Sequence, residues 1–159
     1  MIQRIQHLYL LFLVVLCTIF LNRPIVSGES SEESPTQYDI TANGFYINQG
    51  SGIIAEFSAP SIFLWLILSL SFITIFLFRN LSLQKLLCYL NYLFISLFII
   101  FFAINWISNI NAGEYPINSI SYLSILNIFL MFGLLLINYL AIRSIEKDEE
   151  LIKASDRVR

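Results

Sequence analysis

Four long apolar runs limit what this chain can fold into. They are Leu8–Leu21, Ile62–Phe78, Leu86–Ile107 and Ile120–Ile142, and none of them contains Asp, Glu, Lys, Arg or His. A helix needs about 20 mostly apolar residues to cross the hydrocarbon core of a bilayer. In the whole chain 57% of residues are hydrophobic and only 13% are charged, whereas soluble proteins carry about 25% charged residues. These features exclude a water-soluble globule and predict an integral membrane protein.

The predicted fold class is an all-α membrane protein, a bundle of four transmembrane helices that forms a single domain over residues 1–159. The spans are expected at about residues 5–22, 61–78, 86–108 and 120–142, and a cytoplasmic tail at residues 143–159. The first run has a second interpretation as a cleavable signal peptide, because Arg4 precedes its apolar core and the small residues Ser27-Gly28 follow it. We expect it to be retained as a span.

Basic residues lie almost entirely on one side of the predicted spans. Cytoplasmic loops of membrane proteins carry an excess of Lys and Arg. With the N-terminus inside, the outer side holds only Arg23. The inner side holds Arg4, Arg79, Lys85, Arg143, Lys147, Lys153, Arg157 and Arg159. We therefore expect a multi-pass protein of the bacterial inner (cytoplasmic) membrane, with both termini cytoplasmic and a periplasmic loop between the first two spans.

The periplasmic loop over residues 22–61 contains a signal for a β-hairpin. Its first part, Gly28–Pro35, is polar and typical of flexible chain. Asn43-Gly44 then separates the β-prone segments Tyr38–Ala42 and Phe45–Asn48, and this dipeptide is the strongest short-range hairpin signal. Because a lone two-stranded hairpin is marginally stable in water, we expect it to lie on the helix ends or on a partner.

Polar side chains form a stripe along the third span, where a turn of 100° per residue places them within about 100° of one another. They are Gln84, Cys88, Asn91, Asn105 and Asn109. On the fourth span Ser124, Asn127 and Asn138 fall within about 60°. These stripes would suit either a pore lining or hydrogen bonds between helices. We favour interhelical polar packing, because Ile95, Phe98 and Phe102 interrupt the third-span stripe on the same face.

No group of residues suited to catalysis or to cofactor binding is evident in the sequence. His7 has no second histidine, and Cys17 and Cys88 belong to different spans, which excludes a metal site of standard ligand count. The sequence has no glycine-rich phosphate loop, and its net charge of −2 gives no attraction to nucleic acid. We therefore expect no catalytic, cofactor-binding or metal-ligating residue, and no nucleotide or nucleic acid as a partner.

The tail over residues 143–159 is predicted to be a helix that docks on a cytoplasmic partner or on the inner loop. It carries five basic and five acidic residues, so attraction to an anionic leaflet should cancel. It contains no Gly or Pro that would end the fourth helix. Its apolar side chains fall within about 140° on a helix, and they are Ile145, Leu151, Ile152 and Val158. The alternative is a solvated helical extension.

Three segments of the chain resemble a known family. They are the opening Met1–Gln6, the stretch Leu83–Asn91 that enters the third span, and the ending Lys147–Lys153. They are similar to a family of small bacterial membrane proteins, found chiefly in Bacteroidota and catalogued as domain of unknown function 4293. The resemblance covers the whole chain and implies four helices and an inner-membrane location. It implies no activity.

Three functions are compatible with these features. The leading hypothesis is a non-enzymatic accessory or scaffold subunit of a membrane complex, with the lipid bilayer and a membrane protein as its partners. A small transporter or channel is the first alternative, and it rests on the polar stripes. A lipid-directed membrane enzyme is the second, and it rests only on the outer acids Glu56 and Glu114.

Overall fold

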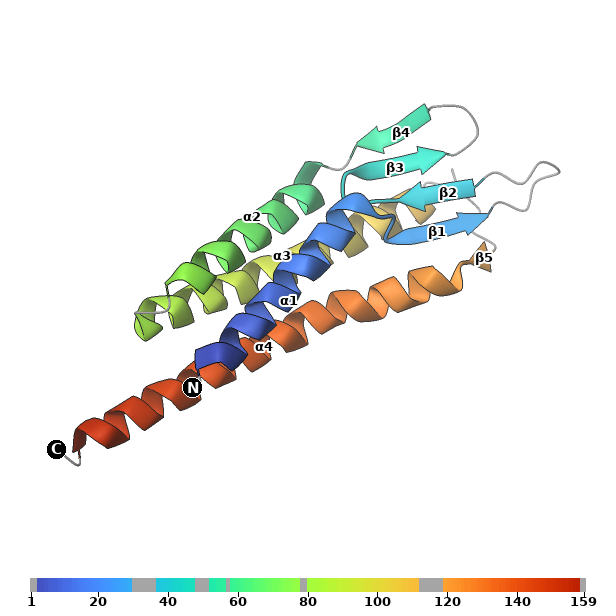
Figure 1. The fold of residues 1–159 in the computed structure, drawn as a ribbon. Helices are drawn as coiled ribbons and strands as arrows, with labels where there is room; N and C mark the ends of the chain where they lie inside the picture. The colour runs from blue at the N-terminus through green and yellow to red at the C-terminus, as the bar shows by residue number, and fades with distance from the viewer. Residues whose placement is uncertain are drawn as a thin grey trace.

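Four helices and a five-stranded sheet make up the computed structural model of the chain (Figure 1). The helices are α1 (Gln3–Asn22), α2 (Ser58–Phe76), α3 (Leu81–Asn111) and α4 (Tyr122–Arg157). The strands are β1 (Val26–Glu29), β2 (Gln37–Ile40), β3 (Gly44–Ile47), β4 (Gly52–Glu56) and β5 (Ser119–Ile120). The structure describes residues 3–29, 37–47, 52–56, 58–77, 80–111 and 119–157.

The predicted four helices are present, and three of them are long and apolar enough to cross a membrane. These membrane-length segments are Ile5–Asn22, Leu81–Ser108 and Tyr122–Ala154, and the apolar part of α2, Pro60–Phe76, is shorter. The third helix begins at Leu81, before the span expected at about residues 86–108, because the carbonyl of Asn80 already accepts the first helical hydrogen bond, from Gln84 N at 3.0 Å.

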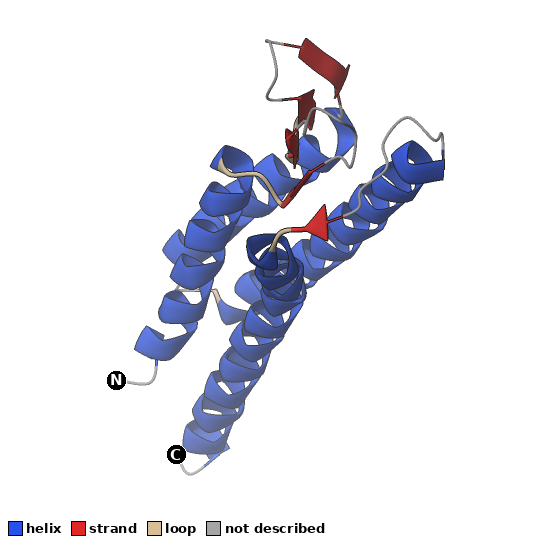
Figure 2. Ribbon diagram, turned by 90° about the vertical axis from the view of Figure 1, so that its right-hand side faces the viewer, coloured by secondary structure: helices blue, strands red, loops and turns tan. Residues whose placement is uncertain are grey.

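Each helix packs against two others. α1 contacts α2 and α4, and α3 contacts the same two helices, so α1 and α3 occupy opposite corners of the bundle. The N-terminus and the tail of α4 lie at one end, which we call the tail end, and the sheet lies at the other, the sheet end (Figures 1 and 2). The last part of α4 continues past the bundle, so the predicted tail is helical as far as Arg157.

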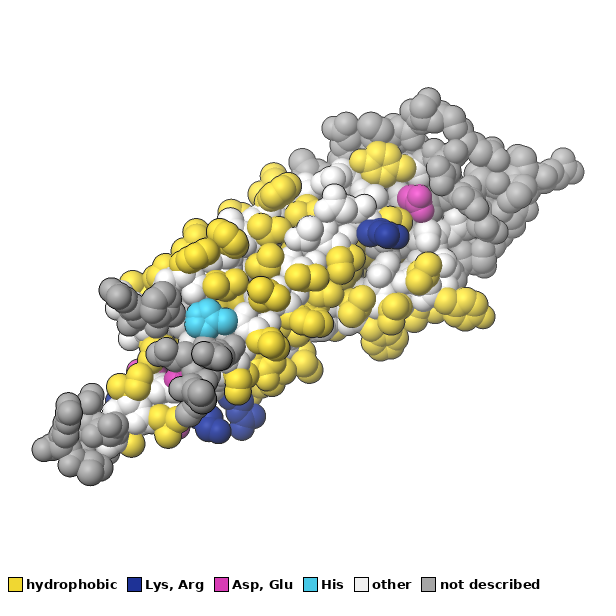
Figure 3. All heavy atoms as spheres, viewed as in Figure 1, with side chains coloured by type: hydrophobic (Ala, Val, Ile, Leu, Met, Phe, Trp, Pro, Cys, Tyr) yellow, Lys and Arg dark blue, Asp and Glu magenta, His cyan; other side chains and the backbone are white. Residues whose placement is uncertain are grey.

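Buried side chains recur every three or four residues along each helix, so each helix turns one stripe toward the interior. On α3 this stripe is Gln84, Cys88, Asn91, Ile95, Phe98 and Phe102. The outer faces carry large apolar side chains, and Trp65, Phe129 and Leu123 are each at least 60% exposed. Figure 3 shows such side chains along the length of the bundle. An apolar surface of this extent suits contact with lipid.

The loop after α1 folds into more than the predicted hairpin. β2 and β3 do pair antiparallel, but they belong to a sheet with the order β4-β3-β2-β1-β5. Gly28, expected in flexible chain, lies in β1 and pairs with both Tyr38 of β2 and Ile120 of β5. The predicted hairpin is therefore present, and it belongs to a larger sheet that also pairs with residues that follow α3.

The sheet is fixed to the bundle through the segment that leaves α1. Ser27 N donates to Ser124 Oγ at 2.8 Å, and Ser124 Oγ donates to Ser27 O at 3.1 Å. Asn127 Nδ2 donates to the carbonyl oxygens of Pro24, at 3.1 Å, and Ile25, at 3.2 Å. Ile25 is fully buried within the hydrophobic core of the bundle. The sheet therefore rests on the end of α4.

The turn between β2 and β3 is held by Thr41 and is one residue earlier than expected. Thr41 N donates to Gly44 O at 2.9 Å, which leaves Ala42 and Asn43 as the two loop residues. Thr41 Oγ1 accepts from Asn43 N at 3.2 Å and from Gly44 N at 3.1 Å. The side chain thus supplies the hydrogen bonds that a backbone carbonyl would otherwise make in a tight turn.

Replacing this hydroxyl should loosen the turn without changing its shape. Thr41→Val removes hydrogen bonds worth about 1 kcal/mol net, so we expect roughly five-fold faster amide hydrogen exchange in β2 and β3 if they open locally. Thr18→Val is the matched control, because the Thr18 hydroxyl bonds only the carbonyl of Val14 within its own helix, at 2.9 Å. Equal exchange rates in β3 for both variants would contradict the role given to Thr41.

Candidate functional site

Buried amide side chains join α3 to both of its neighbours. Asn91 Nδ2 donates to Ser71 Oγ on α2 at 2.8 Å, and Gln84 Nε2 donates to the backbone oxygen of Thr74 at 3.3 Å. On the other side, Asn138 Nδ2 of α4 donates to the carbonyl of Cys88 at 2.9 Å. All three amides are 0% exposed. These contacts are interhelical hydrogen bonds of the kind that orient membrane helices.

The remaining polar residues of the two predicted stripes lie elsewhere. Asn105 Nδ2 donates to the carbonyl of Phe101 on its own helix at 2.7 Å. Asn127 binds the segment after α1 and not α3. The side chain of Asn109 lies outside the described part of the chain. The structure therefore brings together Gln84, Cys88, Asn91 and Asn138, and separates Asn105 and Asn127 from them.

Apart from Ser124, which is buried against the segment that leaves α1, the buried polar side chains of the described interior lie in its tail-end half. Moving toward the tail end, the buried stripe changes from Ile67 to Ser71 on α2, from Ile95 to Asn91 on α3, and from Leu134 to Asn138 on α4. The sheet-end half contains Ile95, Phe98 and Phe102, which are buried in the main hydrophobic cluster. The stripe thus does not continue as a polar path through the described bundle.

Four buried polar residues of the described chain were missed by the sequence analysis, and they are Gln6, Ser71, Thr74 and Asp148. Gln6 is 0% exposed and Asp148 is 4% exposed. Asp148 belongs to a run of charged residues that looks fully solvated in sequence, and Gln6 lies at the start of a span. The signal that could have found them is spacing, because Asp148 continues the buried series Asn138, Ala141 and Ile145.

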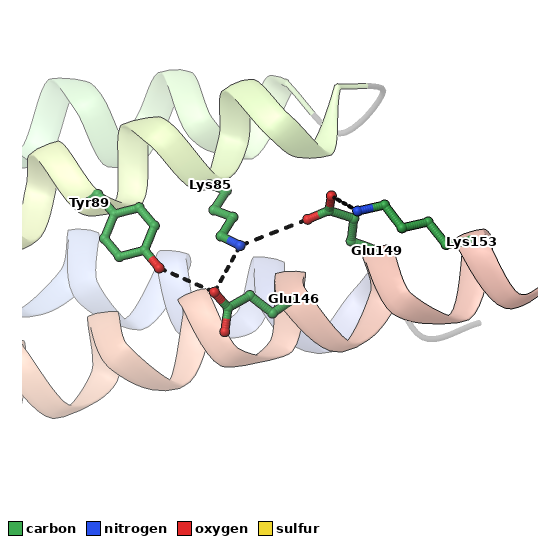
Figure 4. Close-up of polar contacts among 5 residues, drawn as sticks. All are labelled: Lys85, Tyr89, Glu146, Glu149 and Lys153. Atoms are coloured by element: carbon green, nitrogen blue, oxygen red, sulfur yellow. Dashed lines mark hydrogen bonds and ion pairs between the residues drawn. The ribbon is translucent and has the colours of Figure 1, made fainter.

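Charged side chains beyond the buried amides tie the base of the tail to the start of α3 (Figure 4). Lys85 Nζ lies 2.9 Å from Glu146 Oε1 and 3.9 Å from Glu149 Oε2. Tyr89 OH donates to Glu146 Oε1 at 3.2 Å, and Lys153 Nζ lies 2.7 Å from Glu149 Oε1. Glu146 Oε1 thus takes part in both the ion pair with Lys85 and the hydrogen bond from Tyr89. Each such exposed pair contributes at most about 1 kcal/mol.

The apolar residues of the tail lie in two different environments. Ile145 is fully buried and packs with Leu10, Cys88, Ala141 and Ile142. Leu151 and Ile152 are each 46% exposed, and Val158 lies outside the described residues. A groove of about 610 Å³ separates this part of the tail from the first turn of α3. Its lining residues are Asn80, Leu81, Ser82, Leu83, Glu149, Ile152 and Lys153.

Within the described residues, groups that could act as nucleophiles or metal ligands are dispersed. No three His, Cys, Asp or Glu side chains gather there to hold a metal ion. Cys17 and Cys88 are buried free thiols on different helices. His7 Nε2 lies 3.2 Å from the carbonyl of Ile75, which joins α1 to α2. The side chains of Glu56 and Glu114 fall outside the described part.

The sequence model of the family described as Domain of unknown function (DUF4293) matches residues 2–158, which is almost the whole chain. Among curated proteins, none matches this sequence.

The hydrogen bond between Asn91 and Ser71 can be measured with a double-mutant cycle. For Asn91→Leu and Ser71→Ala we expect a coupling free energy of about 0.6 kcal/mol, and no more than about 1.7 kcal/mol, as for other interhelical bonds in membranes. The measurement is reversible unfolding in micelles.

Ser69→Ala serves as the matched partner in a control cycle. Ser69 lies on the same helix but is exposed, and its hydroxyl donates to the carbonyl of Leu66 at 2.9 Å. The coupling of Asn91→Leu with Ser69→Ala should be near zero. If the two cycles gave the same coupling, the bond between α2 and α3 would have no energetic role.

Proposed function

This chain belongs to the family Domain of unknown function 4293, and we propose that it is a non-enzymatic accessory or scaffold subunit of a bacterial inner-membrane complex. The observation that carries the proposal is the tail of α4. It leaves the bundle as a helix, exposes Leu151 and Ile152, and borders an open groove. Exposed apolar side chains next to a groove on an otherwise charged segment are typical of a surface that binds another protein.

The proposed subunit crosses the membrane four times. The apolar part of α2, Pro60–Phe76, has 17 residues and would be about 25 Å long at 1.5 Å per residue, which is at the lower limit for a span. α2 packs against α1 and α3, so it crosses the bilayer beside them. The basic residues of the tail end then face the cytoplasm, which supports an inner-membrane protein with both termini inside.

The first turns of the tail are held against α3 and its later apolar side chains are exposed, an arrangement that suits docking. Lys85 and Glu146 hold its first turns against α3 at 2.9 Å, while Ile152 lies on the groove and is half-exposed. A segment that is already helical loses little conformational entropy when it binds. A cytoplasmic partner that places apolar side chains against Ile152 and Leu83 is the occupant that fits this surface, because Leu83 is also 47% exposed.

The apolar sheet-end half of the core favours a scaffold over a channel. A water-filled path would need polar side chains along the whole bundle, whereas Ile95, Phe98 and Phe102 fill the described interior there. The dispersed nucleophiles and acids of the described residues likewise favour a non-enzymatic role.

Cysteine labelling tests the proposed topology. In a variant without Cys17 and Cys88, single cysteines are placed at Ser31, in the long loop, and at Ser155, in the tail. A thiol reagent that cannot cross membranes should label the first and not the second in spheroplasts, because the basic tail is cytoplasmic. Permeabilised cells, in which both positions should react, provide the control. Labelling at position 155 in intact spheroplasts would contradict the proposed topology, because it would place the tail outside.

Charge placed on the tail surface tests the proposed docking. Ile152→Asp, alone or with Leu151→Asp, should reduce the complex on native gels roughly ten-fold, which is equivalent to about 1.4 kcal/mol. Membrane insertion should be unchanged because the spans provide its free energy. Ala154→Asp adds the same charge at another exposed position of α4 and should leave the complex intact. A complex of unchanged size and abundance in the double variant would rule out docking through this surface.

A further inference from the structure

The acidic side chains in the first turns of the tail are turned toward α3 or toward the interior of the bundle. Glu146 and Glu149 form ion pairs with Lys85 of α3, at 2.9 and 3.9 Å, and Asp148 is only 4% exposed. The five basic and five acidic residues of positions 143–159 are therefore not mixed evenly around the helix. A net charge of zero does not describe the surface that the tail presents outward.

Two basic side chains of the same turns face outward. Arg143 and Lys147 are exposed and lie one helical turn apart. Among the described residues neither forms an ion pair. Each attracts the charge of a neighbouring acid, Glu146 or Asp148, only from beyond ion-pair distance. Their charges are thus available to a ligand outside the chain.

One acid shares this side of α4. Glu150 is exposed and, at 100° per residue, lies within about 60° of Arg143 and Lys147. We call Arg143, Lys147 and Glu150 the basic face of the tail, because two positive charges outnumber one negative charge there. Ile152, which lines the groove, lies about 180° around the helix from Arg143. The basic face and the groove can therefore bind different partners at the same time.

The basic face continues the apolar outer surface of α4. Leu136 and Tyr139 are 60% and 52% exposed, and they lie within about 40° of Arg143 around the helix. At the other end of α4, Tyr122 is 91% exposed. The helix rises about 30 Å from Tyr122 to Arg143, which matches the thickness of about 30 Å of the hydrocarbon core. With Tyr122 at one interface, where tyrosines are enriched, Arg143 lies among the headgroups of the opposite leaflet.

We propose that the basic face of the tail binds the phosphate groups of anionic phospholipids in the leaflet at the tail end. An anionic leaflet attracts basic side chains near its surface, and the guanidinium of an arginine can donate two parallel hydrogen bonds to one phosphate. The level of Arg143 favours lipid over an acidic protein, because a protein would have to penetrate the headgroup layer to reach it. Lipid bound there fixes the depth of α4 and holds the groove, about two turns farther along the tail, outside the hydrocarbon.

This lipid site does not depend on the scaffold role, and its test needs no protein partner. Purified full-length protein in detergent is titrated with phosphatidylglycerol, which is anionic, or with phosphatidylcholine of the same acyl chains, which carries no net charge. Native mass spectrometry counts the bound lipids and gives the affinity for each. Wild type should bind phosphatidylglycerol at least about five-fold more tightly, because each basic residue near the surface contributes about 1 kcal/mol.

Matched neutral variants test which face of the tail is responsible. Arg143→Gln and Lys147→Gln should each weaken phosphatidylglycerol binding about five-fold, and together they should remove the preference over phosphatidylcholine. Lys153→Gln removes the same charge from another side of the tail, where its ammonium lies 2.7 Å from Glu149, and should bind as wild type does. Glu150→Gln removes the acid of the basic face and should strengthen binding.

The site is overturned if wild type binds the two lipids equally. It is also overturned if Lys153→Gln weakens binding as much as Arg143→Gln does, because the response would then follow net charge and not the basic face. An acidic protein would be the ligand instead if Arg143→Gln and Lys147→Gln reduced a complex on native gels but left lipid binding unchanged, and this result would contradict the proposal as well.

Discussion

The rest of this structure depends on how the four helices are aligned with one another. Buried amide side chains set this alignment in a bundle whose outer surface is apolar. Hydrophobic burial cannot position helices relative to one another in lipid, because the lipid tails are as apolar as the side chains. A donor left without an acceptor there costs several kcal/mol. The bonds of Asn91 to Ser71, at 2.8 Å, and of Asn138 to the Cys88 carbonyl, at 2.9 Å, therefore fix how the helices align along one another. Helix faces with apolar side chains alone would permit other alignments.

This register has consequences at both ends of the bundle. At the tail end it places Lys85 beside Glu146 and brings Asp148 into the interior, so that α4 continues past the bundle from a fixed base. At the sheet end it places Ser124 and Asn127 against the segment that leaves α1, which supports the five strands. The described chain thus presents a folded surface at each end of the bundle, which is compatible with the proposed scaffold role.

The sequence predicted the helices well because their signals are local. Apolar runs mark α1 to α4, and the lack of Gly and Pro after Ile142 explains why α4 continues to Arg157. The sheet was underestimated because β1 forms in a polar stretch and β5 has two residues, and both depend on pairing between distant segments. The burial of Asp148 was missed for the same reason, since it follows from the register of α4 against α1 and not from its charged neighbours.

Photo-crosslinking in native membranes tests the central claim of a scaffold subunit most directly. A photoreactive amino acid at position 152 of the tail would report what lies against the groove in the cell. The account predicts one dominant crosslinked protein, recovered in a fixed ratio to this chain, and a much weaker product from the same amino acid at position 136, where Leu136 faces outward from the spans with 60% exposure. Crosslinks to lipid alone at both positions would contradict it.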